Sequence, residues 1–259
     1  MINSIHIAAF THTGLYRKRN EDSLLIPGHL ITKTAMDNPV FNTITKFPAL
    51  LAVADGLGGC VAGDVASGEV LRYLGKTTPP PDDEESLMAC INGAADHLVS
   101  LALKDPALDG FGTTLSGVLV TARYLFIFSC GDSRVYCSTP DQKRLTLMTK
   151  DHSVIQEMID AGTLSEKEAR NHPLGHVITS CLSGGRVTRR PDIRIQKAVP
   201  ISGSRIVICS DGVWDYGGEE VLKAAHTGDL KEASKHMADV CFEAGAPDNI
   251  TFIIADIES

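Results

Sequence analysis

A series of short strand-like runs, many of them rich in Val, Ile and Leu, constrains the fold more than any other feature of this chain. The runs cover residues 5–11, 23–26, 49–54, 114–121, 124–129, 134–138, 144–149, 193–199, 205–209 and 251–257. Connections as short as residues 121–124 and 130–134 leave no room for a crossover helix, so these neighbours should pair as antiparallel hairpins. The sequence therefore predicts a large antiparallel sheet system.

Helical periodicity is weaker but clear in five segments, residues 64–74, 86–104, 154–161, 219–225 and 230–244. Two of them are long enough to cover a sheet face. The pattern Ser165-Glu-Lys-Glu168 matches a capping box and predicts the start of a short exposed helix. Residues 39–48, bounded by prolines, are expected to form an insertion or a loop before a buried strand. Because no internal repeat or linker is found, we expect one domain over residues 1–259.

The composition excludes several function classes. The 259 residues are 43% hydrophobic, and 24 Lys and Arg against 32 Asp and Glu give a net charge of −8, which disfavours a nucleic-acid surface. Seven cysteines without a Cys-x-x-Cys pattern favour a reducing cytoplasm over a disulfide framework or a zinc site. No basic leader precedes an apolar run, and no apolar stretch is expected to reach the roughly 18 residues of a membrane span.

Acidic residues recur where the predicted strands begin or end, at Glu21, Asp22, Asp55, Asp132, Asp211 and Asp248. One such carboxylate is usually a turn residue that accepts from nearby N–H groups. Five separate occurrences weaken that reading, because strand ends are where a rigid scaffold presents functional groups. If the strands converge, the carboxylates repel one another unless protons or a hard divalent cation neutralise them.

Three segments around these acids each have an ordinary structural reading. The turn Asp55-Gly-Leu-Gly-Gly59 matches neither the dinucleotide fingerprint nor a Walker A loop, and alone it is most simply a tight turn. Asp248-Asn249 alone is an Asx turn. Arg17-Lys18-Arg19 is either a solvated charged turn or a phosphate-binding element, since an Arg fork can bind two phosphate oxygens.

Seven motifs in order over residues 17–251 resemble those of the metal-dependent protein phosphatases of type 2C, and in particular the short bacterial serine/threonine phosphatases. They are Arg17…Asn20-Glu21-Asp22, Asp55-Gly-x-Gly-Gly59, Gly112-Thr-Thr114, Gly131-Asp132-Ser-Arg134, Asp151-His152-Ser153, Ser210-Asp211-Gly-x-Trp-Asp215 and Asp248-Asn249-Ile-Thr251. The resemblance implies an α+β fold, a four-layer α/β/β/α sandwich in which helices flank two antiparallel sheets.

The resemblance also assigns roles. Asp55 would bridge two metal ions, the Gly56 carbonyl would be a ligand, and Asp22 would support the ligands. Asp132 together with Asp211 would hold a third ion, and Arg17 would bind the phosphate. The implied catalytic residues are Arg17, Asp55 and Asp211; the implied metal site comprises Glu21 (through water), Asp22, Asp55, Gly56, Asp132, Asp211 and Asp248.

The implied reaction is hydrolysis of phosphoserine or phosphothreonine in proteins by in-line attack of a metal-bridging water or hydroxide. Oxygen ligands select Mn²⁺ or Mg²⁺, with two core ions and a third. The resemblance further implies a cytoplasmic monomer that acts on phosphoproteins, opposes a eukaryotic-like Ser/Thr kinase and works beside forkhead-associated proteins, without nucleic acid or membrane partners.

Two departures from the family pattern bear on mechanism. Residues 152–183 resemble the flap beside the active site, but His172-Pro-Leu-Gly-His176-Val-Ile-Thr-Ser180 lacks two charges that many bacterial relatives carry there. Leu57 stands where many eukaryotic relatives have a His that protonates the leaving alkoxide. A serine or threonine alkoxide needs a proton to leave, so a water on a third cation at Asp132 is the expected acid.

Two other functions stay open on the sequence. A phosphoprotein-binding module with the same fold would be expected to have lost a metal carboxylate, whereas the set is complete here. A phosphatase of small metabolites is compatible with the same motifs; an open, shallow site would favour protein substrates.

Overall fold

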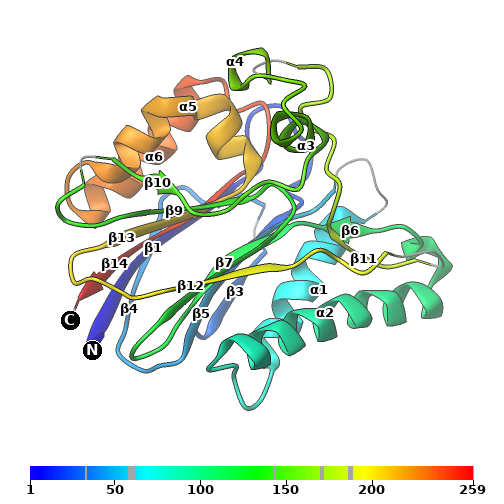
Figure 1. Ribbon diagram of the computed structural model, residues 1–259, viewed down its shortest axis with the longest axis horizontal. Coiled ribbons are helices and arrows are strands. Elements are labelled where there is room, and N and C mark those ends of the chain that lie inside the picture. Colours follow the sequence, from blue (N-terminus) through cyan, green and yellow to red (C-terminus); the bar gives the residue numbers. More distant parts are fainter. Residues whose placement is uncertain (33, 58–61, 143, 170–171, 186–188, 259) are drawn as a thin grey trace.

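The chain is described by a computed structural model that covers residues 1–32, 34–57, 62–142, 144–169, 172–185 and 189–258 (Figure 1). Two six-stranded antiparallel sheets form its centre. The β14 sheet has the order β10 (Thr146–Leu147), β9 (Arg134–Ser138), β13 (Arg205–Cys209), β14 (Ile250–Glu258), β1 (Ser4–His12) and β4 (Val40–Ile44). The β5 sheet has the order β12 (Arg194–Ala198), β8 (Leu125–Cys130), β7 (Leu115–Val120), β5 (Ala49–Asp55), β2 (Asp22–Ile26) and β3 (His29–Ile31). A small third sheet pairs β11 (Leu182–Ser183) with β6 (Gly112–Thr113).

Helices cover the outer face of each large sheet (Figure 1). The β5 sheet is covered by α1 (Gly63–Lys76) and α2 (Glu84–Lys104), after which comes the 3-10 turn η1 (Pro106–Leu108). The β14 sheet is covered by α5 (Asp211–His226) and α6 (Leu230–Glu243). The short helices α3 (Val154–Asp160) and α4 (Glu166–Ala169) lie in the segment between β10 and β11.

Three apolar interfaces separate the layers. Alternate residues of one strand serve different interfaces: Ile253 of β14 packs between the sheets, and Ile254 packs under α5 and α6. Likewise Val53 of β5 faces the other sheet, and Ala54 faces α1 and α2. Because both faces of each sheet are covered, the central strands are apolar on both sides, and the expected four-layer α/β/β/α sandwich is confirmed.

The element boundaries differ from the sequence prediction in several places. The expected loop over residues 39–48 contains β4, an exposed edge strand whose polar positions conceal its alternation. The run 144–149 forms only the two-residue strand β10, which is exposed. Helix α5 begins at Asp211, eight residues before the predicted start, and continues across a kink at Gly218, where φ is +54°. The capping box of α4 is confirmed, since Ser165 and Glu168 bond reciprocally.

Helix α2 contradicts the expectation that no segment is long and apolar enough to cross a membrane. By length and composition alone, its 21 residues pass that test among the described residues. Leu87, Ile91 and Leu98 of this helix are fully buried in the core against the β5 sheet. A core helix of a water-soluble protein has this same composition.

Residues 152–183, the segment that resembles a flap in sequence, are tied to the sheets at their base. His152 N donates to the Gly131 carbonyl at 2.9 Å, and Thr179 N donates to the His152 carbonyl at 2.8 Å. The two ends of this segment are therefore joined beside the β8–β9 turn. Arg170, which belongs to the pattern that suggested a flap, lies outside the described residues, as do Gly58 and Gly59 of the Asp55 motif.

Candidate active site

The strand register brings the first two carboxylates together. Asp22, the first residue of β2, pairs with Asp55, the last residue of β5. Asp22 is 2% exposed; its Oδ2 accepts from Ser210 Oγ at 2.8 Å. Burial, followed by the nearby Asp211 and Asp248, raises the pKa of Asp22 to about 7. The neighbouring strands β2 and β5 therefore hold two closely spaced acids at the same end of the β5 sheet.

The β14 sheet supplies two more acids at the same end of the molecule. Asp211 follows β13 and is the first residue of α5, where the helix N-terminus favours a negative charge. Asp248 precedes β14, the neighbour of β13. Only glycine fits at position 212, where the segments that carry Asp211 and Asp248 meet, because a Cβ there would lie 1.9 Å from the Asn249 carbonyl oxygen. Asp211 and Asp248 therefore lie near each other and near Asp22.

Asp55, Asp132 and Asp211 repel one another. The pKa of Asp55 lies well above its usual range because of burial and then Asp22, Asp211 and Asp132. A hydrogen bond joins the Asp55 and Asp211 side chains, and the pKa of Asp211 is also raised, first by burial and then by Asp248. Burial and Asp211 raise the pKa of Asp132, which follows β8. These three acids and Asp22, of which Asp22 and Asp132 are buried and Asp55 and Asp211 half-buried, need protons or cations to coexist.

Glu21 and Gly56 meet at the edge of this cluster. Gly56 N donates to the Glu21 carbonyl at 3.1 Å. A Cβ on Gly56 would lie 2.3 Å from the Gly63 carbonyl oxygen, so only glycine allows α1 to approach β5 this closely. Burial raises the pKa of the half-buried Glu21, and Arg17 lowers it in part.

Arg17 pairs with a different acid from those that flank it in sequence. Its Nη2 lies 2.5 Å from Asp248 Oδ2, and 46% of its side chain is exposed. The loop that carries it is tethered by Asn249, which donates to the carbonyls of Thr13 and Arg19 and accepts from Glu21 N. The local sequence around Asn249 indicates only an Asx turn, because its partners in this tether lie more than 200 positions away.

The donor set fits a hard divalent cation. Carboxylate oxygens dominate the cluster, and the buried Asp22 Oδ1 has no hydrogen-bond partner among the described residues. A buried, unsatisfied carboxylate oxygen costs free energy unless a cation or proton satisfies it. As the side chains stand, no group of three His, Cys, Asp or Glu in the described ranges is arranged around one point; instead, Asp55 contacts Asp211, and Asp248 contacts Arg17. Mg²⁺ and Mn²⁺ are the cations that such oxygen ligands suit.

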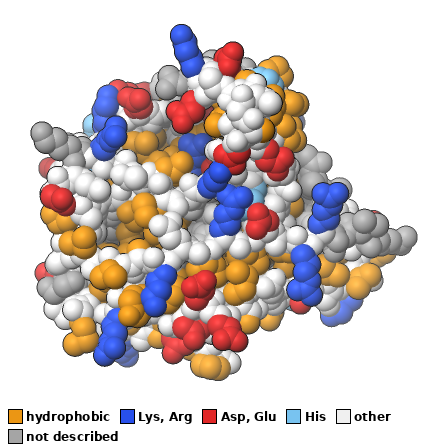
Figure 2. Space-filling model, in the orientation of Figure 1, with side chains coloured by type: hydrophobic (Ala, Val, Ile, Leu, Met, Phe, Trp, Pro, Cys, Tyr) orange, Lys and Arg blue, Asp and Glu red, His pale blue; other side chains and the backbone are white. Residues whose placement is uncertain are grey.

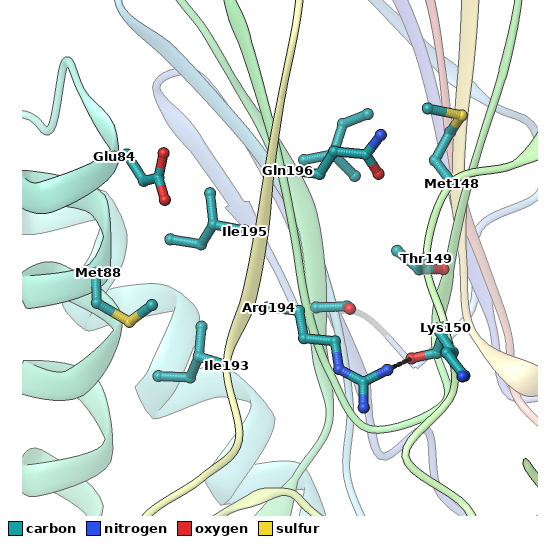
Figure 3. Close-up of a pocket in the computed structure, with 11 residues that line it drawn as sticks. Glu84, Met88, Met148, Thr149, Lys150, Ile193, Arg194, Ile195 and Gln196 are labelled. Carbon is teal, nitrogen blue, oxygen red and sulfur yellow. Dashed lines mark hydrogen bonds between the residues drawn. The ribbon is translucent and has the colours of Figure 1, made fainter. Parts of the chain in front are cut away.

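Two cavities lie near the sandwich. One of about 510 Å³ adjoins the cluster and is lined in part by Lys18, Arg19 and Asp22. The other, of about 550 Å³, lies along β12, where Ile193 and Ile195 point toward α2 and Arg194 points toward Lys150 (Figure 3). None of the clustered acids lines this second cavity. The face shown in Figure 2 carries basic and acidic side chains interspersed.

The architecture and the acidic cluster together define a four-layer sandwich protein with an oxygen-rich site where the sheet ends meet. Residues 36–246 match the sequence profile of the family described as protein phosphatase 2C. The chain belongs to this family.

Its similarity to curated relatives extends over nearly the full chain. It is 31% identical over 257 residues to the serine/threonine protein phosphatase PstP of Mycobacterium tuberculosis, covering 98% of this chain and 45% of that relative, so it spans about half of that protein's length. It is 31% identical over 265 residues to the serine/threonine phosphatase stp of Listeria innocua, covering 97% and 96%.

Two solved structures have the same fold as this chain. The crystal structure of M. tuberculosis PstP/Ppp superposes with a TM-score of 0.79 at 31% identity, covering 99% of this chain and 100% of that one. A structure of the PstP catalytic domain in complex with two manganese ions gives a TM-score of 0.76 at 29% identity and the same coverage.

Proposed function

We propose that this chain is a metal-dependent protein phosphatase that hydrolyses phosphoserine and phosphothreonine. The observation that carries the proposal is the cluster of four acids at the strand ends, the buried Asp22 and Asp132 and the half-buried Asp55 and Asp211, whose pKa values are all raised. Bound cations relieve the mutual repulsion of these acids when they are ionised. A cluster with only a structural role would have no such use for cations. The relatives' names as serine/threonine phosphatases and the two manganese ions in the PstP structure support the same assignment.

Mn²⁺ or Mg²⁺ would be held by Asp55, the Gly56 carbonyl, Glu21, Asp211 and Asp248 at two core positions, with Asp22 supporting them and Asp132 with Asp211 at a third. When bound, divalent cations neutralise phosphate charge and lower the pKa of a coordinated water. The chain's part is to hold these oxygens on strand ends from both sheets, so that the ligands are positioned before substrate arrives.

Arg17 would bind the phosphoryl oxygens. Its guanidinium is partly exposed and already holds a carboxylate, Asp248, in a charge-assisted contact. A phosphate presents similar oxygens with more negative charge, and the planar guanidinium fork matches them. The neighbouring cavity, lined in part by Lys18 and Arg19, leaves room for the peptide that flanks the phosphorylated residue.

We further propose that residues 1–259 act as one catalytic domain with a flap at 152–183, and as a monomer, since every proposed ligand comes from one chain. Phosphoproteins would be the substrates, because the relatives are named serine/threonine protein phosphatases. A eukaryotic-like Ser/Thr kinase would oppose the enzyme in the cytoplasm, with forkhead-associated proteins as companions.

Turnover of a phosphothreonine peptide with Mn²⁺, Mg²⁺ or EDTA tests the proposal, and Asp55→Asn and Asp211→Asn sharpen it. Each variant removes one charge from the cation site, so Mn²⁺-dependent hydrolysis should fall by at least about a hundredfold while the fold survives. Asp239→Asn, at an exposed carboxylate of α6, is the control and should keep full activity. Full activity of Asp211→Asn, or activity of the wild type that EDTA does not abolish, would refute the assignment.

A further inference from the structure

Three residues of the sequence motifs have no place among the proposed ligands, yet they form a continuous chain of contacts to Asp132. Trp214 Nε1 donates to the Asp132 carbonyl at 3.1 Å. The guanidinium carbon of Arg134 lies 3.3 Å from the centroid of the Trp214 ring. Arg134 in turn binds Asp151 through two nitrogens, with Nε–Oδ1 at 3.1 Å and Nη2–Oδ2 at 2.7 Å.

Asp132 needs such support because its surroundings are unfavourable for a carboxylate. It is 7% exposed and lies near Asp211 and Asp55. Repulsion from those acids acts to swing the side chain away from the cluster. The turn can resist only if its backbone is fixed, and the indole bond to the Asp132 carbonyl does this directly.

The same turn is fixed from the flap side. His152 Nδ1 lies 3.1 Å from Gly131 N, from which it accepts a hydrogen bond, and His152 N donates to the Gly131 carbonyl. Gly131 has φ of +106°, and a Cβ there would lie 2.7 Å from Thr114 Cβ, so only glycine fits in the turn at this position. Asp151 and His152 are adjacent, and both bind to the β8–β9 turn or its flanking residue, Arg134.

We propose that Trp214, Arg134 and Asp151 are positioning residues that orient the Asp132 carboxylate toward Asp211 and link that orientation to the base of the flap. The proposal rests on the proposed function in one respect, namely that Asp132 helps to bind a cation. Only Arg can serve at position 134, because its planar guanidinium stacks on the indole while its edge binds Asp151.

The competing explanation is that this ion pair only stabilises the fold. The chain contains a matched pair that separates the two ideas. Arg205 binds Asp256 through two nitrogens at 2.7 Å each, between paired residues of β13 and β14. Arg205 is the first residue of β13, whereas Asp211 follows the last, so this second pair lies at the far end of the strand from the acidic cluster.

The test is Mn²⁺ titration calorimetry on the full chain, with urea unfolding in parallel. Asp132→Ala first identifies the binding step that depends on Asp132. Trp214→Phe, which keeps the aromatic ring and loses the N–H donor, and Asp151→Asn should each weaken that step about tenfold and leave the other Mn²⁺ binding unchanged. Asp256→Asn should lower the stability without changing the isotherm.

The double variant Trp214→Phe/Asp151→Asn should lose no more Mn²⁺ affinity at this step than the more impaired of the two single variants, because both changes interrupt one chain of contacts. Should Asp151→Asn fail to fold, Trp214→Phe decides alone. Unchanged isotherms for Asp132→Ala or Trp214→Phe, additive losses in the double variant, or an equal loss in Asp256→Asn would overturn the proposal. Absence of phosphatase activity in the wild type would instead refute the proposed function, since the isotherms need no turnover.

Discussion

The contact between Arg17 and Asp248 makes a specific prediction about substrate binding. Arg17→Ala removes a charge-assisted phosphate contact and should raise KM for phosphopeptides about tenfold or more. Mn²⁺ affinity should not fall, because the change releases Asp248 from the guanidinium. Steady-state kinetics and Mn²⁺ titration measure the two effects separately.

Lys18→Ala, at the exposed neighbour, is the control and should have a smaller effect on KM. An unchanged KM in Arg17→Ala together with weaker Mn²⁺ binding would mean that the arginine serves only as an ion-pair partner of Asp248.

Asp132 allows a second test at single-residue scale, based on the leaving group. A serine or threonine alkoxide needs a proton to depart, and general acid catalysis contributes about 10²–10⁴-fold, whereas p-nitrophenolate leaves without one. If Asp132 anchors a cation whose water supplies that proton, Asp132→Ala should slow hydrolysis of a phosphothreonine peptide about a hundredfold more than that of p-nitrophenyl phosphate.

The comparison of the two substrates in the same variant provides its own control for folding. Equal losses on both would show that Asp132 acts on the core metal site or on the fold and does not anchor the source of the proton.

At the scale of the elements, the close approach of α1 to β5 should be sensitive to one methyl group. Gly56→Ala would place its Cβ 2.3 Å from the Gly63 carbonyl and 2.7 Å from the Glu21 carbonyl. We expect it to lower the free energy of unfolding by about 1–3 kcal/mol and to weaken Mn²⁺ binding, because the end of β5 must move.

Gly68→Ala is the matched control on α1. Its Cβ would meet Thr32 Cγ2 at 3.6 Å and Ser23 Oγ at 3.9 Å, both ordinary van der Waals distances, so the change should be neutral or should stabilise the helix by about 0.5–1 kcal/mol. Urea unfolding of both variants checks the prediction, and similar effects from the two would argue against a close-packed contact at Gly56.

Elements with a strong local pattern could be predicted from the sequence. The bounds of β9 and β13 agree with the prediction to the residue, since each is apolar and flanked by turn residues. β4 could not be predicted, because it is an exposed edge strand whose pairing with β1 creates it. The first half of α5 was missed because Gly217 and Gly218 interrupt the helical pattern that continues beyond them.

Part of the candidate site could be anticipated from the sequence, and part could not. Acids at strand ends suggested convergence, and the register Asp22↔Asp55 agrees with it. The pairing of Arg17 with Asp248 and the tether at Asn249 were not predictable from local patterns, because each joins segments more than 200 positions apart. Which basic side chain pairs with which acid depends on how the folded sandwich brings distant segments together.

At the scale of the whole molecule, the acidic cluster joins the two sheets, since Asp22 and Asp55 come from the β5 sheet and Asp211 and Asp248 from the ends of β13 and β14. Their mutual repulsion acts across the interface between the sheets. The stability of the whole sandwich should therefore depend on how that charge is neutralised.

This coupling predicts opposite pH trends with and without metal. Burial raises the pKa of Asp22 to about 7 in the folded chain, from about 4 in an unfolded one. In EDTA the protonated form therefore stabilises the fold fully below about pH 4, and this stabilisation is lost as the pH rises to about 7. Mn²⁺ binds the ionised acids, so its stabilisation, about 2.7 kcal/mol at a hundredfold excess over Kd, should grow over the same range.

Urea unfolding at pH 5, 6, 7 and 8, in EDTA and in Mn²⁺, measures both trends. The two stability curves should diverge as the pH rises, and Asp22→Asn should reduce the slope of the EDTA curve because it removes one of the titrating acids. Asp239→Asn, at an exposed carboxylate paired with Lys235, should leave both curves in place. Parallel curves in the wild type would mean that the acids of the two sheets are not neutralised by metal at all, and the cluster would then be a structural feature of the sandwich and no cation site.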